Sequence, residues 1–99
     1  MPEPELHEAV KQLFNENAVF YKHEVVLSKQ DRVDFMIDGI ALEIKDGGGV
    51  SAIIRQLHRY AQCDAVASVI LLTTKLSHKK VPSIMNGKSV AVIILENWV

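Results

Sequence analysis

The chain has little of the chemistry that cross-links a small protein. Its 99 residues include one cysteine, Cys63, so no internal disulfide forms, and no Cys/His spacing is typical of a zinc site. No apolar run is long enough to cross a bilayer, and the acidic start lacks the apolar segment of a signal peptide. These absences predict a cytoplasmic protein, or one domain of a larger assembly, with no membrane contact.

An excess of charge of one sign is also missing. Eleven Lys and Arg residues oppose twelve Asp and Glu residues, which leaves a formal net charge of −1. A nucleic-acid partner must therefore be held by a local basic patch rather than by an overall positive field. No helix-turn-helix, zinc finger or row of stacking aromatics supports base-specific recognition. A hydrophobic content of 48% predicts one folded domain over residues 1–99.

Hydrophobic periodicity predicts an α/β domain. Helical spacing indicates helices from residue 5 to about 14 and over 50–62, separated from each other by strands and by a glycine-rich loop at 46–51. Strands are predicted at 18–27, within 32–46 as a hairpin, at 66–74 and at 90–99, with a short helix and an Asn86-Gly87 turn in the 76–89 connection. The order α-β-β-β-α-β-(short α)-β predicts a mixed sheet flanked by helices. Trp98 is expected to pack on the core or on a partner.

The hairpin "RVDFMIDGIALEIKD" (32–46) sets the most informative register. Asp38-Gly39 favours a two-residue type I′ turn, which pairs Phe35 with Leu42 and Asp34 with Glu43. Alternation then predicts two faces. The apolar face comprises Val33, Phe35, Ile37, Ile40, Leu42 and Ile44. The other face carries Asp34, Glu43 and Lys45.

Two carboxylates opposite each other across a strand pair are destabilising, with Cβ atoms roughly 4.5–5.5 Å apart. A divalent cation reverses the sign of that interaction, because carboxylate oxygens are ligands for Mg²⁺ or Mn²⁺. The sequence therefore predicts a metal site at Asp34 and Glu43, with the carbonyl of Ile44 as a further ligand and Lys45 beside an attacking water or the phosphate charge. The alternative from spacing alone is a surface salt-bridge cluster in which Lys45 neutralises one acid.

The pattern D34-x8-E43-I44-K45 resembles that of the PD-(D/E)xK phosphodiesterase superfamily. The sequence Q56-L-H-R-Y60, in the helix after the lysine, resembles the Q-x-x-x-Y motif of its RecB-like branch. The resemblance covers nearly the whole chain and implies a restriction-endonuclease-like fold, with Gln56 and Tyr60 orienting the metal site or the substrate. One departure is Asp31, at a position that is often glycine in these families.

The resemblance also implies an acid from the first helix, for which Glu5 and Glu8 are candidates, and Glu24 is a third acidic candidate. Phosphate contacts are expected from two basic clusters. These comprise Arg55, His58 and Arg59 on the second predicted helix, and Lys75, His78, Lys79 and Lys80 in the later loop. For each basic residue alone, a solvated surface is the competing interpretation.

Together these features predict a minimal Mg²⁺- or Mn²⁺-dependent nuclease, acting on DNA rather than RNA by backbone or structure recognition. A chain this short would work as a homodimer or within a larger complex, and paired copies would suit a two-strand or branched substrate. The alternative is a non-catalytic module that keeps the nuclease fold and binds nucleic acid or a protein partner.

Overall fold

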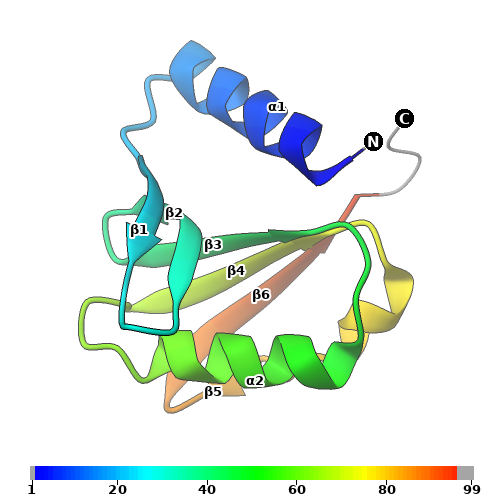
Figure 1. Cartoon of the computed structure of the whole chain (residues 1–99). Helices are drawn as coiled ribbons and strands as arrows, with labels where there is room; N and C mark the ends of the chain where they lie inside the picture. The colour runs from blue at the N-terminus through cyan, green and yellow to red at the C-terminus, as the bar shows by residue number, and fades with distance from the viewer. Residues whose placement is uncertain (1, 96–99) are drawn as a thin grey trace.

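The computed structural model describes residues 2–95 and contains two α-helices, one short 3₁₀-helix and six strands in that range (Figure 1). Its elements are α1 (Glu3–Glu16), β1 (Lys22–Val26), β2 (Arg32–Ile37), β3 (Ile40–Lys45), α2 (Val50–Ala61), β4 (Ser68–Thr73), the 3₁₀-helix η1 (Leu76–Lys80), β5 (Ile84–Met85) and β6 (Lys88–Ile94). No helix within residues 2–95 has the length and apolar composition needed to cross a bilayer. Trp98 and the end of the predicted last strand lie outside the described residues.

The strands form one mixed sheet in the order β1-β2-β3-β4-β6-β5. β1, β2 and β3 are antiparallel neighbours, whereas β3, β4 and β6 run parallel to one another. The predicted α/β class and mixed sheet are confirmed. The two-residue strand β5 was not predicted; it pairs with β6 across the Asn86-Gly87 turn, where both residues have positive φ.

The two helices cover opposite faces of the sheet, as Figure 1 shows. On the α1 face, Leu6 and Val10 pack against Phe35, Leu42 and Ile44. The α2 face buries a larger apolar set, which comprises Val33, Met36, Ala41, Ile53, Leu57, Tyr60, Ala61, Val66, Val69, Leu71, Val81, Met85 and Val90. β4 contributes alternate residues to both faces, which explains its continuous apolar sequence.

Side-chain alternation breaks at one level of the sheet. Glu24 in β1 has a φ of 54°, a left-handed conformation that is rare for a glutamate. The β1–β2 pairing has no ladder pair at the level of Glu24 and Asp34, although the register is the same on both sides of that level. Val33 consequently packs on the α2 face while Phe35 packs on the α1 face. The prediction that Val33 and Phe35 share a face is wrong, because this local irregularity reverses the direction of the side chains.

The β2–β3 turn has the predicted position but a different geometry. Ile37 pairs with Ile40 and Phe35 with Leu42, which confirms the predicted register. Asp38 has a φ of 51°, whereas Gly39 does not have a positive φ, so the turn is not type I′. Glycine is needed at position 39 for another reason. A Cβ there would lie 3.0 Å from the Cβ of Ala67, and the Gly39 carbonyl accepts a 2.7 Å hydrogen bond from the Ala67 amide.

We expect Gly39→Ala to destabilise the chain by ~1 kcal/mol, because Ala67 is held by its own backbone bond and cannot move away. Gly49→Ala is the matched control: a Cβ at Gly49 meets nothing within 4 Å, and its φ of −76° suits alanine. The control should be neutral or stabilising by up to ~1 kcal/mol. Urea unfolding of both variants measures the difference, and equal midpoints would contradict the close approach.

Candidate functional site

Asp34 and Glu43 lie where β2 and β3 part. The backbone pairing of these strands ends at Phe35 and Leu42. Beyond this pair, the backbone amides bond carboxylate side chains of the opposite strand instead of its carbonyl groups. The Ile44 amide donates to Asp34 Oδ2 at 2.7 Å, and the Asp34 amide donates to Glu43 Oε1 at 3.3 Å. Each carboxylate is thus bonded to backbone of the opposite strand. Asp34 and Glu43 are adjacent, as predicted. Ile44 contacts Asp34 through its amide, whereas the prediction concerned its carbonyl as a metal ligand.

Glu43 is buried, with a side chain only 4% exposed, and both of its oxygens are engaged. Its Oε2 lies 3.3 Å from Lys45 Nζ, and its Oε1 accepts a 2.9 Å hydrogen bond from the Tyr60 hydroxyl. Lys45 itself remains 25% exposed. The Lys45 side chain therefore extends from the buried Glu43 carboxylate to solvent. From there it can contact both Glu43 and a bound substrate.

Burial, and after it the nearby charge of Asp34, raise the pKa of Glu43 from its ordinary 4.5 to about 7. The Lys45 ammonium, the Tyr60 hydroxyl and the Asp34 amide oppose this shift because they favour the ionised form. Burial and the charge of Glu43 raise the pKa of Tyr60, so the phenol keeps its proton. A carboxyl that titrates near neutral pH inside a charged cluster is a common property of functional sites.

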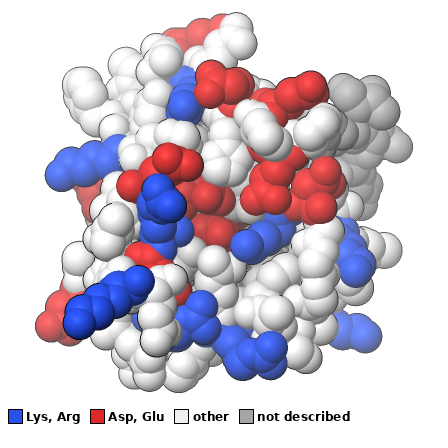
Figure 2. All heavy atoms as spheres, in the orientation of Figure 1, with Lys and Arg blue, Asp and Glu red and all other residues white. Residues whose placement is uncertain are grey.

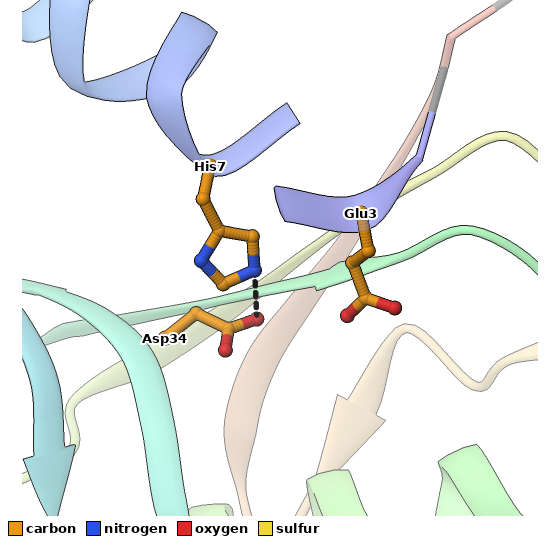
Figure 3. A group of neighbouring side chains, drawn as sticks. All are labelled: Glu3, His7 and Asp34. Carbon is orange, nitrogen blue, oxygen red and sulfur yellow. Dashed lines mark ion pairs between the residues drawn. The ribbon is translucent and has the colours of Figure 1, made fainter. Parts of the chain in front are cut away.

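Asp34 turns toward α1, not toward α2. Its Oδ2 lies 3.7 Å from His7 Nε2, and Glu3 approaches from the same helix (Figure 3). One ligand atom from each of Glu3, His7 and Asp34 lies within 4.8 Å of the others. The prediction that Asp34 shares a face with Glu43 and Lys45 is therefore wrong. The irregular backbone at the level of Glu24 and Asp34 directs Asp34 to the other side, while Glu43 and Lys45 do share a face, as predicted.

Glu3 and His7 were not among the candidates from the sequence. They stand four apart on α1, and that spacing in "EPELH" places them on one helix face. The predicted helix began at residue 5, so Glu3 lay outside it. Glu5 and Glu8 are exposed, and Glu8 pairs with Lys11 at 3.1 Å. Glu24 contacts Arg32 at 4.0 Å. Glu8 and Glu24 line the same shallow hollow as Asp34 without belonging to the three-residue cluster.

Gln56 and Tyr60 form a chain of hydrogen bonds that ends on Glu43. Gln56 Nε2 donates to the Tyr60 hydroxyl oxygen at 2.9 Å, and the hydroxyl lies within bonding distance of both Glu43 Oε1 and the Arg32 carbonyl. Tyr60 is fully buried. Their spacing on one helix face, inferred from the sequence, does bring this pair to the acidic residues.

The glycine loop is fixed to the chain after β4. The Gly48 carbonyl accepts from His78 Nε2 at 2.9 Å and from Lys75 Nζ at 3.3 Å. His78, completely buried, also bonds Thr73 through its other ring nitrogen. His78 is therefore a structural clamp and not part of an exposed basic cluster. Gly47 and Gly48 have φ values of 108° and 92°, which other residues rarely adopt.

The basic residues separate into two groups. Arg55, Lys79 and Lys80 are exposed and remain candidates for phosphate contact. Arg59 instead forms an ion pair with the buried Asp31, with Nε 2.9 and 3.1 Å from the two carboxylate oxygens. In Figure 2, acidic atoms gather in the upper and central part of the face shown, and most basic atoms lie in its lower half. On this face, therefore, an acidic surface borders a more basic one.

Searches against protein-family models, curated proteins and solved structures found no match for this chain.

The raised pKa of Glu43 predicts a pH-dependent stability. The folded chain binds this proton more tightly than the unfolded chain, so the contribution of Glu43 is complete below pH 4.5 and is lost as pH rises to about 7. The free energy of unfolding of the metal-free chain should fall by up to ~3 kcal/mol over that window. Glu43→Gln should lack this fall, whereas the exposed control Glu16→Gln should keep it. Parallel curves for wild type and Glu43→Gln in urea unfolding at several pH values would contradict the assignment.

Tyr60→Phe tests the hydrogen bond to Glu43 directly. Loss of the hydroxyl removes a donor that favours the ionised carboxylate, so the pKa of Glu43 should rise above about 7. A side-chain carboxyl carbon titration by NMR measures this value. Tyr21→Phe, which alters a tyrosine packed between Phe14 and Phe35, should leave the titration unchanged. A Glu43 titration unaffected by Tyr60→Phe would show that the hydroxyl bonds elsewhere.

Proposed function

We propose that this chain is a metal-dependent phosphodiesterase of the PD-(D/E)xK type, with a restriction-endonuclease-like fold and nucleic acid as its substrate. The observation that carries the proposal is the position of the two acids at the opening between β2 and β3, each bonded to the other strand, with Lys45 on Glu43. Nothing in the packing of the core requires a buried glutamate with a raised pKa beside a second carboxylate. Such a pair is unfavourable unless a cation or a proton compensates it.

The donor groups suit a divalent cation. Asp34, His7 and Glu3 offer two carboxylates and an imidazole within 4.8 Å of one another, and Glu43 lies on the other side of the Asp34 backbone. Carboxylate oxygens suit Mg²⁺ and Mn²⁺, and an imidazole ligand favours the transition metal. When bound, such an ion supplies Lewis acidity toward a phosphoryl oxygen and a water molecule.

The residues of the chain have distinct tasks in this proposal. Asp34 holds its orientation through the Ile44 amide, which leaves its second oxygen available. Glu43 must be ionised, and the Tyr60 hydroxyl and Lys45 favour that state. Lys45, partly exposed, can stabilise through its Nζ the charge that develops on the phosphate. Gln56 acts through Tyr60 and is a positioning residue.

DNA is the proposed substrate, held by its phosphates. Arg55, Lys79 and Lys80 are exposed, while the Lys75 ammonium lies on the Gly48 carbonyl. The glycine loop follows β3, which ends at Lys45, and its Gly48 carbonyl contacts Lys75 next to the basic segment η1. Lys45 and the basic segment therefore lie at two ends of the same loop contact. Phosphate contacts of this kind give affinity without base specificity.

Manganese should stabilise the chain. A ligand present at 100 times its Kd adds about 2.7 kcal/mol to the free energy of unfolding, a shift of several degrees or more in melting temperature for a chain of this size. Asp34→Asn should abolish the shift and His7→Ala should reduce it, whereas Glu16→Gln should retain it. Calorimetric melting with Mn²⁺ or with EDTA measures the effect. An equal shift in wild type and Asp34→Asn would exclude Asp34 as a ligand.

Cleavage should depend on Lys45. With Mn²⁺ and a panel of linear duplex, single-stranded, nicked, flap and four-way-junction DNA, Lys45→Ala and Lys45→Met should lose on the order of 10²-fold or more in rate. The exposed Lys29→Ala variant, purified identically, is the control for activity and contamination. Circular dichroism checks that each variant folds. A manganese shift without cleavage of any substrate would favour the non-catalytic nucleic-acid-binding module instead.

A further inference from the structure

A second histidine lies directly behind His7. The Nδ1 atom of His7, in α1, is 3.1 Å from the Nε2 atom of His23, in β1, and both side chains are partly buried. Since His7 Nδ1 faces His23, the other ring nitrogen of His7, Nε2, faces Asp34 at 3.7 Å. The two imidazoles and the carboxylate therefore form a row that ends in the cluster of Glu3, His7 and Asp34 (Figure 3).

Both imidazole rings pack on Phe35, which is fully buried. The ring centroid of His23 lies 4.7 Å from that of Phe35, at an interplanar angle of 33°, and the centroid of His7 lies 5.7 Å from it. The two histidine rings meet edge to face, with centroids 5.4 Å apart. Because a buried aromatic ring supports both imidazoles, packing as well as the hydrogen bond sets the direction of each ring nitrogen.

The cluster borders a hollow with room for further ligands. The hollow has a volume of about 510 Å³, and its lining includes His23 together with Glu3, His7 and Asp34. Asp34 uses Oδ2 to accept from the Ile44 amide, and its Oδ1 has no hydrogen bond within residues 2–95. An ion held by the cluster would therefore have space for water or a phosphate oxygen beside its protein ligands.

The hydrogen between the two rings decides whether His7 is able to ligate a metal. The 3.1 Å contact of two ring nitrogens needs one hydrogen between them, and neutral imidazoles offer two arrangements. If His23 Nε2 donates, His7 carries its own hydrogen on Nε2, which then has no lone pair for a metal. If His7 Nδ1 donates, His7 Nε2 keeps a free lone pair facing Asp34. Only the second arrangement suits a metal ligand, because a ligating histidine donates its other ring N–H to a neighbouring acceptor.

We infer that His23 is a positioning residue for the metal: it accepts a hydrogen bond from His7 Nδ1, leaves His7 Nε2 free to ligate the ion, and so gives the site a preference for a transition-metal ion such as Zn²⁺ over Mg²⁺. His23 thereby serves the metal-dependent function proposed above, on which this inference rests. Imidazole nitrogen suits Zn²⁺, whereas Mg²⁺ takes oxygen ligands. In the metal-free chain the charge of Asp34 favours the hydrogen on His7 Nε2, so metal binding exchanges the hydrogen positions on both rings, and each ring keeps one hydrogen.

Titration calorimetry of the full chain with Zn²⁺, and separately with Mg²⁺, tests the role of His23. His23→Leu removes the acceptor and should raise the Zn²⁺ Kd about tenfold or more, while Mg²⁺ binding stays unchanged. His23→Gln keeps a side-chain oxygen that can accept from His7 Nδ1, and it should recover most of the Zn²⁺ affinity. His58→Leu, at an exposed histidine of α2, is the control and should bind both ions like the wild type. Circular dichroism checks that each variant folds.

Nitrogen–proton correlation spectra of the wild type report the hydrogen positions without any substitution. At a pH of about 8 the neutral imidazole predominates. His7 should then carry its hydrogen on Nε2 in the metal-free chain and on Nδ1 with Zn²⁺ bound, and His23 should change from Nε2 to Nδ1 in the same step.

Two outcomes would overturn this inference and leave the proposed function standing. One is Zn²⁺ binding that Asp34→Asn abolishes and His23→Leu leaves unchanged. The other is a hydrogen that stays on His7 Nε2 when Zn²⁺ is bound. A wild type that binds no divalent ion would contradict the proposed function, and this inference with it.

Discussion

The site depends on a conflict between burial and charge at Glu43. A carboxylate in this position loses hydration and meets the negative field of Asp34, and three donors offset the cost only in part. The surrounding elements are arranged around this one group. α2 brings the Tyr60 hydroxyl, β3 brings Lys45 two residues further along, and β2 contributes an amide instead of a ladder bond. Such a group is stabilised either by a bound proton or by a nearby positive charge, here that of Lys45.

The sequence predicts well the part of the site around Glu43, Gln56 and Tyr60, because these positions follow regular strand and helix periodicities. The register of the hairpin follows from Asp38-Gly39, and the i, i+4 spacing of Gln56 and Tyr60 brings them to Glu43 across the α2 face. These relations involve neighbouring strands and the helix that follows them, so they need no knowledge of distant contacts.

The rest of the site depends on irregular backbone and on distant pairs. No alternation rule anticipates a glutamate with positive φ at position 24, nor, at the same level of β2, Asp34 turned toward His7 and Val33 packed on the α2 face. Arg59 looked like part of a basic surface because its partner, Asp31, is 28 residues away. His78 looked exposed for the same reason, since its acceptor is the Gly48 carbonyl, 30 residues earlier. Polar residues in loops are the ones whose partners a pattern cannot specify.

The ion pair of Arg59 and Asp31 has a mechanical consequence. Asp31 stands at the start of β2, just after the β1–β2 turn, and Arg59 is the residue before Tyr60 on α2. Arg59 Nε lies near both carboxylate oxygens of Asp31, so this contact ties α2 to the start of β2 one residue before Tyr60, whose hydroxyl bonds Glu43. The outer β1–β2 hairpin and the buried Glu43 carboxyl are thereby joined through two consecutive residues of one helix, Arg59 and Tyr60.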